Sequence, residues 1–203
     1  MTPLFLKGLA FGFVLAATVG PMWMLCFRRT LASGALAGFV SGMGIAAADA
    51  IYGAVAAFGI TAVSAVLLAH RFWLGLLGGG FLIYLGIRAL IAAPPAPNGA
   101  ATEKLPLPAA FLSTLGLTLA NPPTILAFAA IFAGLGLGTG AGYAGAATVV
   151  LGVFLGSASW WVILALGAAR LRARLGAGLL RGLNVVSGIV ILAFALWQLA
   201  RLV

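Results

Sequence analysis

The longest uncharged stretch of the chain runs from Leu105 to Ala169 without a single Lys, Arg, Asp or Glu. A helix needs about 20 mostly apolar residues to cross a bilayer, so this stretch alone can supply more than one crossing. Only 6% of the 203 residues are charged, whereas soluble domains have about 25%. The sequence therefore predicts an all-α integral membrane protein with several crossings and no separate soluble domain.

Six crossings are predicted, at residues 4–26, 36–58, 72–91, 107–131, 145–167 and 183–202. The proline-rich segment 92–106 reads as an exposed linker, because proline cannot continue a helix. It divides the chain into two halves of three crossings each, 1–91 and 107–203. The apolar N-terminal run is too long for the core of a signal peptide. We interpret it as an uncleaved first crossing that ends at Arg28 and Arg29.

The formal net charge is +9. In a soluble protein this excess suggests nucleic acid, but here the basic residues flank apolar runs, where they orient helices and meet lipid headgroups. We therefore expect membrane lipids and no nucleic acid as partners. Eight of the 11 basic residues face the cytoplasm when both termini lie outside, which predicts that orientation. Cys26 and His70 are each the only residue of their type, so we expect no disulfide, metal or other cofactor.

The two halves share several features that predict an internal repeat. Because each half has an odd number of crossings, related halves would be inserted in opposite orientations, as in many secondary transporters. Gly20–Pro21 lies late in the first predicted crossing, and Asn121–Pro122 lies late in the fourth. Three further pairs match at a constant offset: Gly44 with Gly152, Asp49 with Ser157, and Tyr52 with Trp160. The sequence thus predicts two inverted three-helix repeats.

The prolines predict breaks in the first and fourth crossings. A proline inside a helix leaves the carbonyl four residues earlier without its N–H partner. In hydrocarbon, such broken backbone survives only against protein or a water-filled cavity. The helix that follows a break also starts with free N–H groups that suit a carboxylate. A simple kink is the alternative, but two matching breaks favour a substrate cavity that includes Gly20, Pro21, Asn121 and Pro122. Pro122 and Pro123 free the carbonyls of Thr118 and Leu119.

Asp49 is one of two acids in the chain and the only one within a predicted crossing. A central Asp costs about 2.5–3.5 kcal/mol on insertion scales, so such residues usually face the bundle interior and serve transport or proton transfer. Asp49 could hold a substrate ammonium group, carry a proton, or simply make a structural hydrogen bond. Tyr52 lies one turn on and shares its face. Thr118 and Ser157 add polar groups beside the second break and at the Asp49 counterpart.

Motifs that carry catalysis are absent from the sequence. There is no GxSxG or HExxH motif, no Ser–His or Cys–His pair with plausible partners, and no nucleotide-binding glycine pattern. We therefore expect that the protein is not an enzyme and has no catalytic residues. Pairs of small residues four positions apart, Gly8 with Gly12 and Gly152 with Gly156, predict close helix packing within or between protomers.

Taken in order, these motifs resemble the LysE/RhtB family of amino-acid exporters. Gly20–Pro21, the run 27–38, and then Gly44, Asp49, Tyr52 and Gly59 are similar to the first half of that family. The run 76–86 resembles its third crossing, and Asn121–Pro122 resembles the signature of its fourth. The resemblance covers nearly the whole chain. It departs at Val19, where many members have proline, and at Pro123, where many have lysine.

The resemblance implies an exporter of six helices in a bacterial-type inner membrane. Such a protein moves amino acids or their derivatives out of the cytoplasm against proton or sodium flow, often as a homodimer. The resemblance carries functional roles to Gly20, Pro21, Asp49, Asn121 and Pro122. We expect the half-helix N-termini to hold the substrate carboxylate, Asp49 and freed carbonyls to hold the ammonium group, and rocking of the two halves to expose the site alternately. The alternatives are an ion exporter or channel on the same fold and a non-transporting membrane assembly factor.

Overall fold

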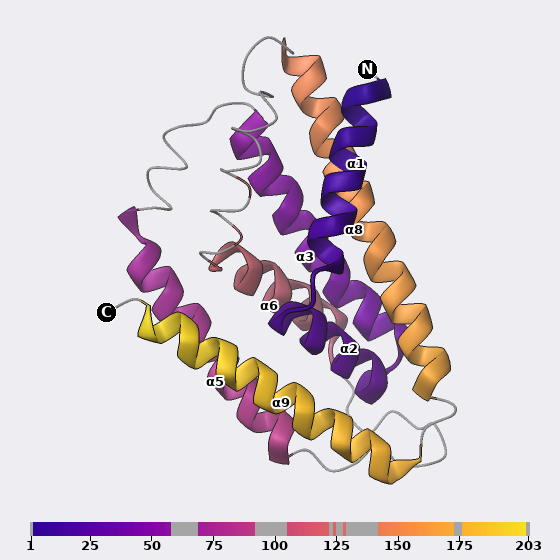
Figure 1. The fold of residues 1–203 in the computed structure, drawn as a ribbon, viewed down its shortest axis with the longest axis vertical. Helices are drawn as coiled ribbons and strands as arrows, with labels where there is room; N and C mark the ends of the chain where they lie inside the picture. The colour runs from indigo at the N-terminus through magenta and orange to yellow at the C-terminus, as the bar shows by residue number, and fades with distance from the viewer. Residues whose placement is uncertain are drawn as a thin grey trace.

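The computed structural model describes residues 2–57, 69–91, 105–121, 124, 128, 142–172 and 176–201. Over these residues the chain forms helices and no strand, which confirms the all-α prediction. Figure 1 shows the helices, which are α1 (Thr2–Ala17), α2 (Pro21–Ser33), α3 (Ala35–Ala57), α5 (Arg71–Ile91), α6 (Leu107–Leu119), α8 (Gly142–Arg172) and α9 (Ala177–Ala200).

Four of these helices, α3, α5, α8 and α9, are long and apolar enough to cross a membrane. The bent pair of α1 and α2 passes the same test only when both are taken together, which gives up to five crossings. Helix α6 is apolar but has 13 residues. Most of the remainder of the predicted fourth crossing, and most of the predicted linker, lies outside the described residues. The protein is therefore a multi-pass helical membrane protein, and its six crossings in two halves stay a prediction.

The predicted first crossing, 4–26, is not one straight helix. Helix α1 ends at Ala17, and α2 begins at Pro21 after a bend of 74°. Pro21 has no N–H with which to continue the hydrogen bonding of α1. Gly20 before it is extended, with φ of −157°. The sequence thus identified the position of the break, whereas the size of the bend is visible only in the structure.

Arg28 and Arg29 belong to α2 and not to a connection between crossings. The sequence analysis ended the first crossing at these residues, because basic side chains usually flank apolar runs. That prediction is wrong, since α2 continues to Ser33. Only 8% of Arg28 and 7% of Arg29 are exposed. The bend turns α2 across the other helices, so both arginines are buried against the helices that α2 contacts.

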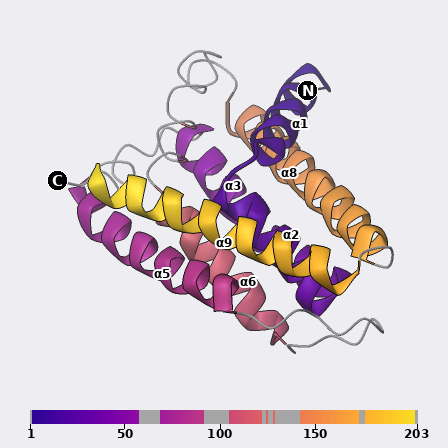
Figure 2. The same ribbon diagram turned by 60° about the horizontal axis from the view of Figure 1, so that its bottom comes forward.

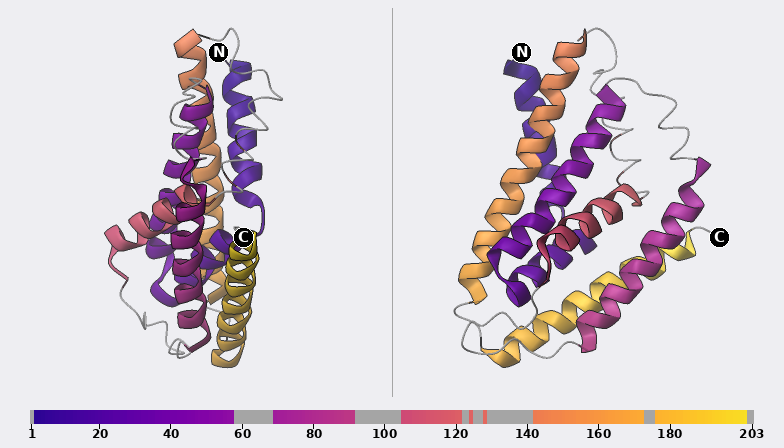
Figure 3. Two further views of the ribbon diagram at one scale, coloured as in Figure 1. Left: turned by 90° about the vertical axis from the view of Figure 1, so that its left-hand side faces the viewer. Right: turned by 180° about the vertical axis from the view of Figure 1, so that it is seen from behind.

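The helices form two groups that meet at α2 and α6. In the first group, α1 and α3 both pack against α8, and α6 packs against α3. In the second, α5 packs along α9, while α2 contacts α3, α8 and α9. Figure 2 shows α5 and α9 side by side on one flank, and Figure 3 shows α1, α3 and α8 together away from them. The most extensive contacts therefore join helices from opposite halves of the chain.

Glycine allows the backbones of α1 and α8 to touch. Gly12 of α1 faces the backbone of Val153, and Gly156 of α8 faces the backbone of Leu9. A Cβ atom at either glycine would overlap the carbonyl oxygen of the residue that it faces. The pairs of small residues in the sequence predicted close packing, and these contacts confirm it.

Gly34 joins α2 to α3 in a backbone conformation that suits glycine. Its φ of 93° and ψ of 170° lie in a region that is essentially restricted to glycine. We expect Gly34→Ala to lower the free energy of unfolding by about 1–3 kcal/mol, although the described residues place no atom beyond the adjoining backbone within 4 Å of the added Cβ. Thermal unfolding of the purified variant measures this cost. The control is Gly176→Ala, because Gly176 is equally open but has φ of −73°; equal melting temperatures for the two variants would contradict the prediction.

Candidate functional site

The carboxylate of Asp49 is buried between two long helices. Asp49 lies in α3 and is 2% exposed, and Ser157 of α8 donates a hydrogen bond of 2.7 Å to its Oδ2 atom. Trp161, four residues further along α8, donates through Nε1 to Ser157 Oγ at 3.2 Å. Among the described residues, no lysine or arginine pairs with Asp49. The carboxylate is thus held by one neutral donor, which leaves its charge without a cationic partner in this part of the chain.

Tyr52 lies one turn after Asp49 and connects α3 to the end of α6. Its hydroxyl donates to the carbonyl oxygen of Leu119 at 2.5 Å. Leu119 is the last residue of α6, and the sequence analysis predicted that its carbonyl is freed by Pro123. In the structure this carbonyl accepts from a side chain outside its own helix. Helix α3 therefore carries two polar contacts one turn apart, one to α8 and one to α6.

Two acceptor oxygens at the end of α6 lack partners. Thr118 Oγ1 and Asn121 Oδ1 are both buried, and neither has a hydrogen-bond partner among the described residues. The amide nitrogen of Asn121 donates to Thr124 Oγ1 at 2.9 Å, which fixes the orientation of the amide. Leaving a buried polar atom unpaired costs free energy, so each oxygen is available to a donor group of a ligand.

We call the following groups the Asp49 site: Asp49, Tyr52, Thr118, Asn121, Ser157 and the Leu119 carbonyl. The hydrogen bond of Tyr52 joins α3 to α6, and the hydrogen bond of Ser157 joins α8 to α3. The Asp49 carboxylate and the unpaired oxygens of Thr118 and Asn121 can each accept a hydrogen bond. Such a set suits a ligand that donates several hydrogen bonds and carries a positive charge, as an ammonium group does.

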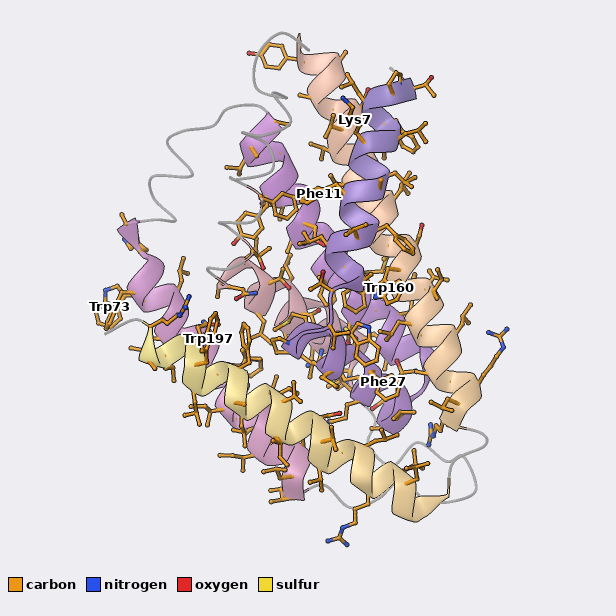
Figure 4. The ribbon with its side chains drawn as sticks, viewed as in Figure 1. Lys7, Phe11, Phe27, Trp73, Trp160 and Trp197 are labelled. Atoms are coloured by element: carbon orange, nitrogen blue, oxygen red, sulfur yellow. The ribbon has the colours of Figure 1, made fainter. Side chains whose placement is uncertain are left out.

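The other predicted residues are placed less directly. Gly20 and Pro21 form the start of α2, and no hydrogen bond between described residues joins them to the Asp49 site. The connection is through apolar packing, because Met22 and Trp23 pack on the cluster that contains Trp161. In the same region, Trp160 of α8, which Figure 4 labels, packs edge-on against Phe13 of α1, with 5.4 Å between ring centroids. Pro122 lies outside the described residues.

Two residues near the site were not recognised as functional from the sequence. The sequence analysis did not single out Trp161, yet it donates to Ser157. Its spacing of four residues from Ser157 on one helix could have revealed this contact. Arg29 was assigned to a loop but makes buried hydrogen bonds to two other helices. No local signal predicts those partners, because they come from distant parts of the chain.

The described residues contain no group of three His, Cys, Asp or Glu side chains that could hold a metal ion. The described groups of the Asp49 site interact by hydrogen bonding and charge. With one carboxylate and several neutral acceptors, the site can bind a small cation or zwitterion and can exchange a proton.

Comparison with known proteins supports this reading. The family model of the LysE type translocator matches residues 13–201. One relative is the "Putative amino acid efflux protein YcgF" of Bacillus subtilis (strain 168), which is 26% identical over 197 residues, or 96% of this chain and 94% of the relative. No solved structure matches the chain significantly. Because the family match extends over most of the sequence, the chain belongs to the LysE type translocator family.

Proposed function

We propose that this protein exports amino acids or amino-acid derivatives from the cytoplasm, driven by the opposite flow of protons or sodium ions. The observation that carries the proposal is the buried Asp49 carboxylate, which Ser157 holds without a cation partner among the described residues. A buried charge is costly unless it is paired, so a substrate ammonium group or a proton is the natural partner. The family membership and the relative named for amino acid efflux agree with this cargo.

The substrate is held at both of its charged ends. Its ammonium group donates to Asp49 and to the unpaired oxygens of Thr118 and Asn121. Its carboxylate lies at the start of α2, where Gly20 is the N-cap and makes no side-chain capping bond, so the free N–H groups of the first turn suit an anion. The sequence predicts a second break at Pro122, which lies outside the described residues. Asp49 also takes up the coupling proton when the cargo has left.

The helix contacts support the two inverted repeats. If the halves exchange roles, α1 corresponds to α6, α3 to α8 and α5 to α9. Under this exchange, the contact of α1 with α8 becomes the contact of α6 with α3, and both contacts are present. The α3–α8 pair and the α5–α9 pair each join a helix to its own counterpart, so the exchange leaves them unchanged. Asp49 and Ser157, which the sequence matched at a constant offset, meet in a hydrogen bond. Residues related by a two-fold axis meet in this way only close to that axis.

The basic residues support an orientation with both termini outside. Arg88, Arg170 and Arg172 lie in the last turns of α5 and α8, and Arg181 lies in the first turns of α9. If α1 and α2 together form one crossing, all of these helix ends lie on the same side of the membrane. Lys7, near the start of α1, is far from them (Figure 4). The positive-inside rule assigns the arginine-rich side to the cytoplasm of an inner membrane. Homodimer formation is part of the same proposal.

Counterflow in proteoliposomes tests the function. Purified protein is reconstituted into vesicles loaded with one unlabelled amino acid at a time, and uptake of the labelled form is measured. Uptake of one or a few amino acids, absent from protein-free vesicles, is the expected result. If folded protein moves no amino acid, the proposal fails, and labelled ions become the next cargo to test. Protein that moves neither would point to a membrane assembly factor.

Tyr52→Phe tests the contact between α3 and α6. The variant removes the hydroxyl that donates to Leu119. One hydrogen bond is worth about 0.5–1.5 kcal/mol net, and 1.4 kcal/mol is about tenfold. We therefore expect the counterflow rate to fall about 2–10-fold while the protein remains folded. Tyr84→Phe, at an exposed position on α5, is the control. Identical counterflow rates for the two variants would show that the Tyr52 hydroxyl does not contribute to transport.

A further inference from the structure

Arg29 lies in α2 with its guanidinium buried against two other helices. The residue is 7% exposed. Its Nη1 atom donates to Ser41 Oγ of α3 and to the Ala110 carbonyl of α6, both at 3.1 Å. Its Nη2 atom donates to Ser113 Oγ of α6 at 2.9 Å. Every one of these acceptors is neutral.

Two of the N–H donors of this guanidinium have no hydrogen-bond partner among the described residues. A guanidinium has five N–H donors, and three of them are used by Ser41, Ala110 and Ser113. Ser113 Oγ and the Ala110 carbonyl are themselves neighbours, since Ser113 donates to Ala110 at 3.1 Å. They occupy the end of the guanidinium, with one donor from each Nη atom. The remaining donors are Nε–H and the second Nη2–H, which lie side by side on one edge and form a fork that matches a carboxylate.

The positive charge of Arg29 has no counter-ion in the described part of the chain. Asp49 is the only acid there, and it is bonded to Ser157. Ser41 precedes Asp49 by eight residues on α3, which is about 12 Å along a helix. One amino acid is too short to join Asp49 to Arg29. Because a buried charge without a partner is costly, a neutral side chain would tie α2 to α3 and α6 at lower cost if structure were the only role.

We infer that Arg29 is a carboxylate-binding site separate from the Asp49 site, and that its ligand is the α-carboxylate of the cargo on its way between the cytoplasm and Asp49. The role toward cargo rests on the proposed function, whereas the binding of a carboxylate does not. The Nε–Nη2 edge binds both oxygens of the carboxylate. Arg28, the preceding residue, adds a second positive charge on the same helix. The site selects for an anionic group before the amino group reaches Asp49.

Thermal unfolding of the full-length protein in detergent tests the site with acetate as the probe. Acetamide is the neutral probe of the same shape, and chloride at equal ionic strength is the anion control. A ligand that binds only the folded state raises the melting temperature. At several times its dissociation constant, we expect acetate to raise it by about 2–4 °C, and acetamide and chloride to leave it unchanged.

Three variants locate the effect. Arg29→Gln is expected to abolish the acetate shift, and Arg29→Lys to reduce it, because lysine keeps the charge but lacks the fork. Arg181→Gln, which removes an exposed arginine of α9, is expected to keep the full shift. An equal shift with chloride, or a shift retained in Arg29→Gln, would overturn the inference. So would a shift that appears only in Glu103→Gln, because the chain's own second acid would then be the partner of Arg29.

A measurement on the wild type needs no variant to fold. Cys26, the only cysteine, is fully buried one turn before Arg29 on α2. It reacts with N-ethylmaleimide only when α2 leaves its neighbours, and a ligand that holds α2 in place reduces that population. Acetate is expected to slow the reaction relative to acetamide, and equal rates would contradict the site. Acetate binding at Arg29 without amino-acid counterflow would refute the proposed function alone, whereas counterflow without acetate binding would refute only this inference.

Discussion

Asp49→Asn is expected to abolish measurable counterflow while the protein stays folded. Asparagine keeps the shape of the side chain and an oxygen that can accept the hydrogen bond from Ser157, so the contact between α3 and α8 survives. The negative charge is lost, and with it the partner of a substrate ammonium group or of a proton. Removing one partner from a buried charged pair costs about 2–5 kcal/mol. The rate at low substrate concentration should therefore fall by about 30-fold or more.

Two matched variants show whether the charge itself is responsible. Ser157→Ala removes the hydrogen bond to Asp49 but leaves the carboxylate, so we expect a milder loss of about 2–10-fold. Glu103→Gln removes the only other acid of the chain and should leave counterflow unchanged. If Asp49→Asn transports at the rate and with the pH dependence of the wild type, the Asp49 site is not the transport site. A loss of folding, seen in the melting curve, would be measured separately from a loss of rate.

Gly156→Ala is expected to be the most destabilising of the small substitutions in the helix contacts. The added methyl group would overlap the carbonyl oxygen of Leu9 and lie 2.8 Å from the backbone nitrogen of Phe13. Both are backbone atoms, which cannot rotate away, so α1 and α8 must separate. Overpacking of this kind costs about 1–3 kcal/mol. For a chain of this size, each kcal/mol lowers the melting temperature by about 2–4 °C.

Gly167→Ala on the same helix provides the control. In the part of the chain that the structure describes, no atom outside α8 lies within 4 Å of the Cβ position at Gly167. Alanine favours a helix over glycine by about 0.5–1 kcal/mol. The control should therefore melt at the same or a higher temperature than the wild type. If Gly156→Ala melts no lower than Gly167→Ala, the backbones of α1 and α8 are not in contact in the native protein.

The fold and part of the site follow from local features of the sequence. The predicted crossings 36–58 and 72–91 correspond closely to α3 and α5, because long apolar runs with clear ends leave few alternatives. The match of Asp49 to Ser157 pointed to two positions that form a hydrogen bond in the structure. Inserting a carboxylate into a membrane is so costly that its position alone marks a site.

Other features depend on contacts between distant segments. The position of the break at Pro21 follows from the missing N–H, but the 74° bend depends on what α2 packs against. The burial of Arg29 follows from that bend, because its acceptors Ser41, Ala110 and Ser113 lie on α3 and α6. A hydropathy pattern contains no information on these partners. It therefore assigned Arg29 to the membrane surface, where most arginines of membrane proteins lie.

The contact of α1 with α8 also has a consequence for biosynthesis. The glycine face of α1 is complete when the ribosome has translated its first 17 residues, but α8 begins only at Gly142. At about 5–20 residues per second, the interval is on the order of 10 s. During this time the glycine face of α1 lacks the partner that covers it in the folded protein. The first helix of the chain to be synthesised is thus among the last to reach its final partner.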